Sequence, residues 1–141
     1  MTSGLHHVAV EARNLEASVR FYQALGMVER LRFAEPGEGD VTHTVVFLGT
    51  DAQTFVELFS PTPDGPSPTG ANVPNSQSLF HFALRVEDAD AAYTSALQSG
   101  GTPVEPPTDM TLRGQRGVPC RYAFVRGPSG ETIELIAVED L

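Results

Sequence analysis

Two histidines and two glutamates stand at matching places in the two halves of this chain. His7 opens the apolar segment HVAV, and His81 opens HFAL. Glu57 lies within FVELF and Glu134 within TIELIAV, and each follows its histidine at a nearly equal interval. A glutamate that faces a core is costly unless it is paired or binds a metal. Two imidazoles and two carboxylates suit a divalent ion such as Ni, Zn, Fe or Mn.

This ligand set would support proton transfer. Four protein ligands leave positions open on an octahedral ion, and an open position distinguishes a catalytic metal site from a structural one. The metal would stabilise an oxyanion while a neighbouring carboxylate serves as general base. Taken singly, each histidine is better explained as a strand residue whose ring has hydrogen-bond partners. Each glutamate alone is better explained as facing solvent or as paired with an arginine. The occurrence of all four residues at matching places favours their interpretation as metal ligands.

The elements that position these residues also repeat. Residues 5–11 alternate as a strand does, and His7 shares one face with Ala9. Asn14 is placed to cap a helix whose apolar stripe runs through Val19, and Gly26 ends it. The interval from His7 to Gly26 equals that from His81 to Gly100. Three further strands are expected over residues 27–34, 43–50 and 55–60, which gives the order βαβββ.

The second half repeats this order. A strand over residues 80–86, a helix capped by Asp88 and strands over residues 121–125 and 131–138 are expected. Only Val104 indicates the second strand of this half, and residues 105–119 read as an irregular loop. The predicted organisation is an N-terminal module (1–62), a proline-rich linker (63–78) and a C-terminal module (79–141).

Bulk composition excludes several classes of function. The 141 residues carry a net charge of −9, which weighs against nucleic acid as a partner. No apolar run is long enough to span a bilayer, and the first residues lack the pattern of a secretory signal. The single cysteine, Cys120, fits a reducing compartment. A cytoplasmic protein without membrane contact is therefore expected.

The remaining chemistry-bearing residues have weaker support. Arg113, Arg116 and Arg121 are candidates for binding an anionic group of a substrate, although a solvated basic loop is the favoured explanation. Strand alternation places His6 on the face opposite His7. Cys120 follows Pro119 in the expected loop, and no base that could activate it is evident.

The motifs resemble a known family over essentially the whole chain. LHHVAV with NLEASVRFYQALGM, FVELFSP, FHFALRVEDADAAY and YAFVRGPSGETIELIAV are similar to the vicinal oxygen chelate superfamily, also called the glyoxalase, bleomycin-resistance and dioxygenase superfamily. This resemblance implies an α+β fold in which two βαβββ modules form curled mixed sheets around a metal-binding cavity. It places the family's four ligand positions on His7, Glu57, His81 and Glu134, and it implies a homodimer.

The ligand pattern is most similar to that of lactoylglutathione lyase (glyoxalase I). The resemblance implies a divalent-metal-dependent lyase or isomerase that moves a proton beside a metal-bound carbonyl through an enediolate, with a glutathione hemithioacetal as a candidate substrate. Glu134 would move the proton, and Glu57 would be its symmetric partner. A related epimerase and an extradiol dioxygenase remain open, although the presence of Glu57 disfavours the dioxygenases and the fosfomycin thiol transferases.

A metal-free binding protein of the bleomycin-resistance type is the alternative from another class. This hypothesis rests on an apolar cavity that inward-facing phenylalanines would line. The candidates are Phe47, Phe55, Phe59, Phe80 and Phe82.

Overall fold

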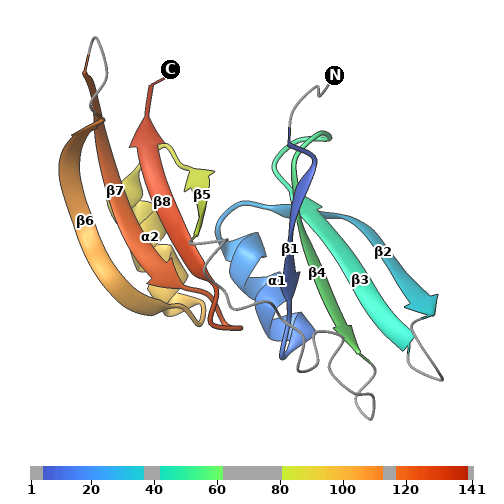
Figure 1. The fold of residues 1–141 in the computed structure, drawn as a ribbon. Helices are drawn as coiled ribbons and strands as arrows, with labels where there is room; N and C mark the ends of the chain where they lie inside the picture. The colour runs from blue at the N-terminus through green and yellow to red at the C-terminus, as the bar shows by residue number, and fades with distance from the viewer. Residues whose placement is uncertain (1–4, 37–41, 62–80, 113–116, 140–141) are drawn as a thin grey trace. The chain divides into compact units, whose positions relative to one another are not determined.

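Each half of the chain begins with a strand that leads through a helix into three more strands (Figure 1). The computed structural model describes residues 5–36, 42–61, 81–112 and 117–139. The chain divides into two compact units, Met1–Ser78 and Leu79–Leu141. The predicted α+β class with two βαβββ modules is confirmed. The predicted boundaries of the linker fall within 62–80, which lies outside the described residues.

The first unit is a four-stranded mixed sheet with one helix. Its strand order is β1-β4-β3-β2; β1 pairs with β4 in parallel, and the other pairs are antiparallel. Its elements are β1 (His7–Glu11), α1 (Leu15–Ala24), β2 (Val28–Pro36), β3 (Thr42–Gly49) and β4 (Phe55–Pro61). A parallel pair needs a crossover connection, and α1 with β2 and β3 supplies it.

The second unit has the same topology. Its strand order is β5-β8-β7-β6, with β5 parallel to β8. Its elements are β5 (Phe82–Arg85), α2 (Ala89–Gln98), β6 (Thr102–Leu112), β7 (Val118–Arg126) and β8 (Thr132–Val138). In the part of the chain that the structure describes, no helix is long and apolar enough to cross a membrane.

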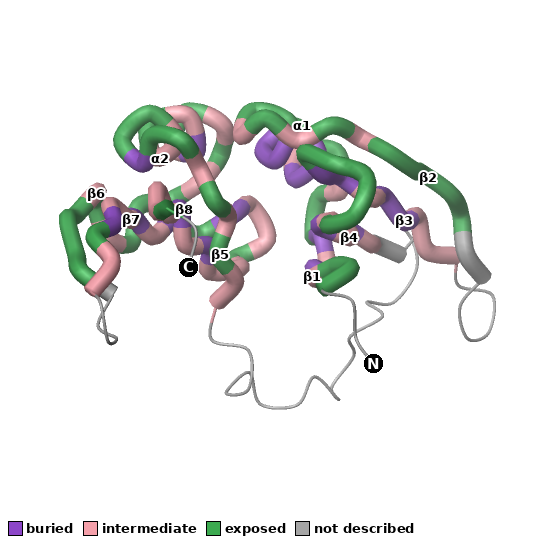
Figure 2. The backbone as a smooth tube through the Cα atoms, turned by 90° about the horizontal axis from the view of Figure 1, so that it is seen from above, coloured by how far each residue is buried: buried purple, intermediate pink, exposed green. Residues whose placement is uncertain are grey.

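Each helix covers one face of its own sheet, and most of the buried residues lie between them (Figure 2). In the first unit, Phe21 and Tyr22 of α1 are fully buried with Leu48 and Leu58 of the strands. In the second unit, Ala96 of α2 is buried with residues of β7 and β8. Alternation along each strand sends the intervening side chains to the other side. We call the side turned away from the helix the distal face of each sheet.

One element of the second unit differs from the sequence prediction. Most of β6 lies in the segment expected to be an irregular loop, so the strand expected around Val104 extends to Leu112, and Cys120 lies in β7 rather than in a loop. Pro103, Pro106 and Pro107 suggested a loop because proline cannot donate a hydrogen bond in a sheet. In the observed sheet β6 is outermost, and its pairing with β7 shifts register on both sides of Glu105. An outer strand with bulges tolerates prolines that a central strand would not.

Both helices begin at the predicted caps. The side chain of Asn14 accepts a hydrogen bond from the backbone N–H of Ala17, and that of Asp88 accepts one from Ala91, each at 3.0 Å. Both caps have extended backbone conformations, as N-caps usually do.

These caps provide a matched test of the repeated fold. We expect Asn14→Ala and Asp88→Ala each to lower the free energy of unfolding by about 1 kcal/mol, because each leaves a helix N–H without its acceptor. Asn14→Asp and Asp88→Asn keep the acceptor and should remain close to the parent protein. Urea unfolding followed by circular dichroism measures the difference. Equal midpoints for the alanine variants and their controls would contradict the prediction.

Candidate metal centre

The first candidate ligand pair lies on the distal face of the first sheet. Ala9 is the register partner of Glu57 in the parallel β1–β4 pair, so His7 lies two residues before that position on the same face. The Nε2 atom of His7 is 3.0 Å from Oε2 of Glu57. The histidine side chain is 39% exposed and the glutamate 20%. Strand pairing therefore brings together two residues that are far apart in the chain.

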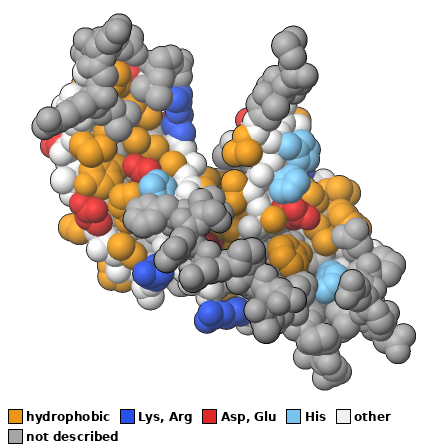
Figure 3. Space-filling view, in the orientation of Figure 1, with side chains coloured by type: hydrophobic (Ala, Val, Ile, Leu, Met, Phe, Trp, Pro, Cys, Tyr) orange, Lys and Arg blue, Asp and Glu red, His pale blue; other side chains and the backbone are white. Residues whose placement is uncertain are grey.

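The second unit repeats this arrangement. Ala83 is the register partner of Glu134 in the parallel β5–β8 pair, and His81 lies two residues before Ala83. The Nε2 atom of His81 is 3.1 Å from Oε2 of Glu134. This pair is more sheltered, because the exposed fractions are 29% for the histidine and 14% for the glutamate. In Figure 3, histidine surface adjoins acidic surface in each unit, with hydrophobic side chains nearby.

The four predicted ligands thus come together as two pairs. Over residues 5–36, 42–61, 81–112 and 117–139, no three His, Cys, Asp or Glu side chains form a group that could hold a metal within the structure. Each pair offers one imidazole nitrogen and one carboxylate. Ligand bonds of about 2.0–2.2 Å place two ligands at right angles about 3 Å apart, which is the separation in both pairs. The donor chemistry and spacing of each pair are compatible with two ligands of a divalent ion.

A phenylalanine accompanies each pair, and sequence reasoning missed its repetition. Phe47 is the register partner of Glu57, and Phe124 is the register partner of Glu134. The ring of Phe47 lies 5.7 Å from that of His7, and the ring of Phe124 lies 5.1 Å from that of His81. Each phenylalanine precedes its glutamate by the same interval, so the signal was present in the sequence.

The predicted direction of His6 is wrong, although it is an exposed residue whose ring packs against neighbouring rings, as expected. His6 precedes the first residue of β1, so strand alternation does not govern its direction. Its Nδ1 atom lies 2.9 Å from Nδ1 of His7, and its ring is tilted against Phe55 at 5.2 Å. A second hydrogen bond to a metal-binding histidine commonly orients the imidazole ring. His6 therefore belongs to the surroundings of the first pair.

The phenylalanines proposed to line an apolar cavity are distributed differently. Phe47, Phe55 and Phe59 share the distal face with Glu57. Phe82 is the register partner of the buried Ile133, which places it on the helix-covered face. Phe80 lies outside the described residues.

Among the predicted anion-binding arginines, Arg113 and Arg116 lie outside the described residues. Arg121 lies in β7 and shares its guanidinium between two carboxylates. It donates to Asp90 of α2 at 3.0 Å and to Asp109 of β6 at 2.9 Å. These bonds raise the pKa of Arg121, and Arg121 holds the pKa of Asp90 below its ordinary value. Substrate binding by Arg121 stays a prediction, and its observed contacts tie the helix to the sheet.

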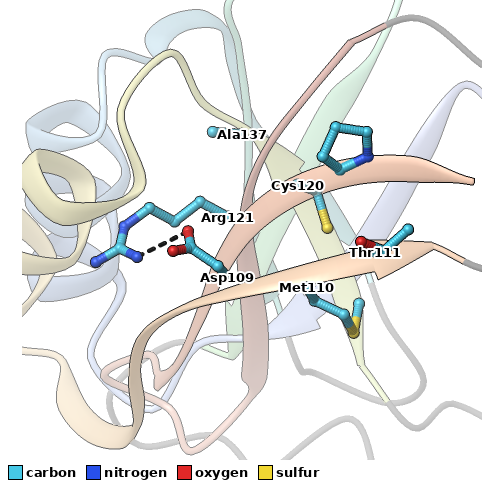
Figure 4. Close-up of a pocket in the computed structure, with 7 residues that line it drawn as sticks. Asp109, Met110, Thr111, Cys120, Arg121 and Ala137 are labelled. Atoms are coloured by element: carbon cyan, nitrogen blue, oxygen red, sulfur yellow. Dashed lines mark hydrogen bonds and ion pairs between the residues drawn. The ribbon is translucent and has the colours of Figure 1, made fainter.

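A pocket of about 510 Å³ lies beside this ion pair at β6, β7 and β8 (Figure 4). Arg121 and Asp109 border it, together with Met110, Thr111 and Cys120. Burial, reinforced by the carboxylate of Glu134, raises the pKa of the Cys120 thiol. A raised pKa disfavours the thiolate, so this cysteine does not have the environment of a nucleophile.

Two βαβββ units with the same His–Glu pair at the same place in each sheet define a class of protein built from a repeated βαβββ module. The sequence comparison then identifies the family. The model of the Glyoxalase/Bleomycin resistance protein/Dioxygenase superfamily matches residues 4–135, so the chain belongs to that superfamily. A comparison with curated proteins gives no match.

Solved structures share this fold at low sequence identity. A glyoxalase family protein from Bacillus cereus is 17% identical with a TM-score of 0.72, over 99% of this chain and 97% of that one. Trypanothione-dependent glyoxalase I from Leishmania major is 22% identical with a TM-score of 0.65, over 96% and 87%. A glyoxalase I variant from Zea mays is 21% identical with a TM-score of 0.67, over 93% and 44%.

The contacts of Arg121 give a pH-dependent prediction. We expect Arg121→Gln to lower the thermal midpoint at pH 7, because α2 loses its ion pair with β7. The folded-state pKa of Asp90 is lowered from 3.8, so this stabilisation is present above that value and is lost as the pH falls through the folded pKa. The difference from the parent protein should therefore shrink below about pH 4.

Arg126→Gln is the matched control, because Arg126 lies on the same strand and donates to the carbonyl of Gly130. Its effect on the thermal midpoint should be smaller and nearly independent of acid pH. Differential scanning calorimetry between pH 7 and pH 2 makes both measurements. If the thermal midpoint of Arg121→Gln stays below that of the parent protein by the same amount over this range, the stabilisation does not come from the ion pair with Asp90.

Proposed function

We propose that this protein is a divalent-metal-dependent lyase or isomerase of the glyoxalase I type. The observation that carries the proposal is the pair of equivalent His–Glu contacts, at 3.0 and 3.1 Å, on the distal faces of two repeated sheets. His7, Glu57, His81 and Glu134 would bind Ni, Zn, Fe or Mn. Membership of the superfamily supports this assignment.

The bound ion would act as a Lewis acid that polarises the carbonyl oxygen of the substrate. The residues of this chain would then move the proton. In a hemithioacetal, a carboxylate oxygen of Glu134 would accept the proton of the carbon that bears the sulfur and the hydroxyl, and would return it to the former carbonyl carbon, while the hydroxyl proton passes to the former carbonyl oxygen. Glu57 occupies the equivalent place in the first unit and is the symmetric partner. The histidines hold the site and exchange no proton with the substrate.

The surroundings of Glu134 suit this assignment. Its side chain is more sheltered than that of Glu57, at 14% against 20% exposure. Phe124 lies directly opposite it on β7, and Ile136 follows on the same face of β8. An apolar environment limits exchange of the abstracted proton with water, so the proton returns to the substrate.

Small carbonyl compounds form the proposed substrate class, with glutathione hemithioacetals to be tested first. Glyoxalase I from Leishmania major and the variant from Zea mays share the fold, which supports the choice of this reaction. A homodimer in the cytoplasm is part of the same proposal.

A second candidate is a metal-free binding protein for an apolar or aromatic small molecule. The supporting observation is the apolar surface on the distal face of the first sheet. Leu31 and Phe33 of β2 are 54% and 39% exposed, and Phe33 stacks on Phe47 with the rings 6.4 Å apart. Such a protein would bind its ligand tightly without turnover and without metal.

Metal uptake and turnover distinguish the candidates. We expect the protein to bind about one Ni or Zn ion per complete ligand set, and His81→Ala to weaken binding because an imidazole ligand is lost. We expect Glu134→Gln to lower the turnover of the hemithioacetal of methylglyoxal by about 10²- to 10⁴-fold, as loss of a general base does. Calorimetric titration and the absorbance of the thioester product measure the two effects.

Glu139→Gln is the control for charge, because Glu139 is exposed just beyond the end of β8. It should leave both measurements unchanged. Metal binding with full turnover by Glu134→Gln would refute the role of Glu134 as base. Absence of uptake of Ni, Zn, Fe and Mn by the parent protein would favour the second candidate.

A further inference from the structure

The same ring contact accompanies both candidate ligand pairs. In the first unit the rings of His7 and Phe47 meet at 86°, and in the second unit those of His81 and Phe124 meet at 81°. Edge-to-face contact of this kind is attractive because the positive edge of one ring meets the negative face of the other. Each histidine thus contacts a carboxylate at Nε2 and a phenylalanine ring, and His7 also contacts His6 through Nδ1.

Strand order explains how this contact forms. In the first sheet β4 lies between β1 and β3, so Glu57 stands between the strand of His7 and the strand of Phe47. In the second sheet β8 separates β5 and β7 in the same way, and Glu134 lies between His81 and Phe124. The phenylalanine is directly opposite the glutamate in register. Its ring must therefore extend beside the glutamate to reach the histidine.

We propose that Phe47 and Phe124 are positioning residues that hold the imidazole rings of His7 and His81 with Nε2 turned toward the carboxylate. This inference rests on the proposed function, because it concerns the orientation of the proposed ligands. An imidazole ring rotates over a broad range about its second side-chain torsion. A phenylalanine against the ring restricts that rotation before any metal binds, which lowers the entropy cost of binding.

The repetition separates this inference from ordinary aromatic packing. Phe21 and Tyr22 also meet edge to face, at 5.2 Å and 88°, but both are fully buried residues of α1. Phe47 and Phe124 are on the distal faces, are only partly buried, and occupy equivalent positions in the two sheets. Duplicated packing alone does not require that each phenylalanine contact a histidine that contacts a glutamate.

The experiment compares Phe47→Leu, Phe124→Leu and the double variant with Phe59→Leu. Phe59 lies on β4 two residues beyond Glu57 on the same distal face, opposite Val45, so it controls for the loss of a phenylalanine from this surface. Phe47→Tyr and Phe124→Tyr keep the ring and test rescue. Three readouts are needed: affinity for Ni by calorimetry at fixed pH, thermal midpoint, and the NMR shifts of histidine ring protons without metal.

In metal-free protein, Phe47→Leu should shift the ring protons of His7 but not those of His81, and Phe124→Leu should do the reverse. Each leucine variant should bind Ni roughly threefold to tenfold more weakly, the range that an aromatic pair energy of this kind implies. The affinity of the double variant for Ni should be lower by the product of the two single-variant factors. The tyrosine variants and Phe59→Leu should bind within about twofold of the parent protein.

Two outcomes overturn the inference. Leucine variants that lose stability but keep the parent affinity would show that the rings serve packing alone. Histidine signals that do not follow the unit-specific pattern would show that the rings do not set the imidazole orientation. If the parent protein binds no metal, the proposed function fails, and the NMR pattern alone decides whether the phenylalanines orient the histidines.

Discussion

Parallel pairing between the first and last strands of each unit is the constraint on which the rest of the structure depends. It joins β1 to β4 and β5 to β8, in each case across the helix and two intervening strands. Because parallel partners point their side chains to the same side, the histidine near the start of one strand lies diagonally beside the glutamate of the other. A shift of one residue in this pairing would turn the two groups to opposite faces.

The carboxylates on the two faces of each sheet have different kinds of partner. On the helix-covered side an arginine of a strand pairs with an acidic residue of the helix: Arg32 with Glu16 in the first unit, and Arg121 with Asp90 in the second. On the distal side Glu57 and Glu134 each have a histidine partner. The arginine pairs anchor the helices and lie at the exposed margin, where ion pairs contribute little. The carboxylates of Glu57 and Glu134 are partly buried and have imidazole partners instead.

The repeat made most of this predictable. Strand alternation and the matched caps indicated both βαβββ units, and the repeated spacing selected the His–Glu pairs from residues that singly had ordinary explanations. The length of β6 was underestimated, because its prolines are typical of a loop and the sequence does not reveal that this strand is the outermost one of its sheet. The orientation of His6 could not be predicted from alternation because it lies before the strand begins. The phenylalanine beside each pair was missed because its meaning depends on register across three strands.

The prolines of β6 also affect how this protein meets other chains. An outermost strand of eleven residues exposes a row of backbone groups that could template another strand. Pro103, Pro106 and Pro107 carry no N–H group, so this strand has three fewer backbone donors than its length would supply, and the register shifts around Glu105 interrupt its regular spacing. Sheet extension along this edge is therefore opposed by covalent structure rather than by charge, so the protection persists at any pH and salt concentration.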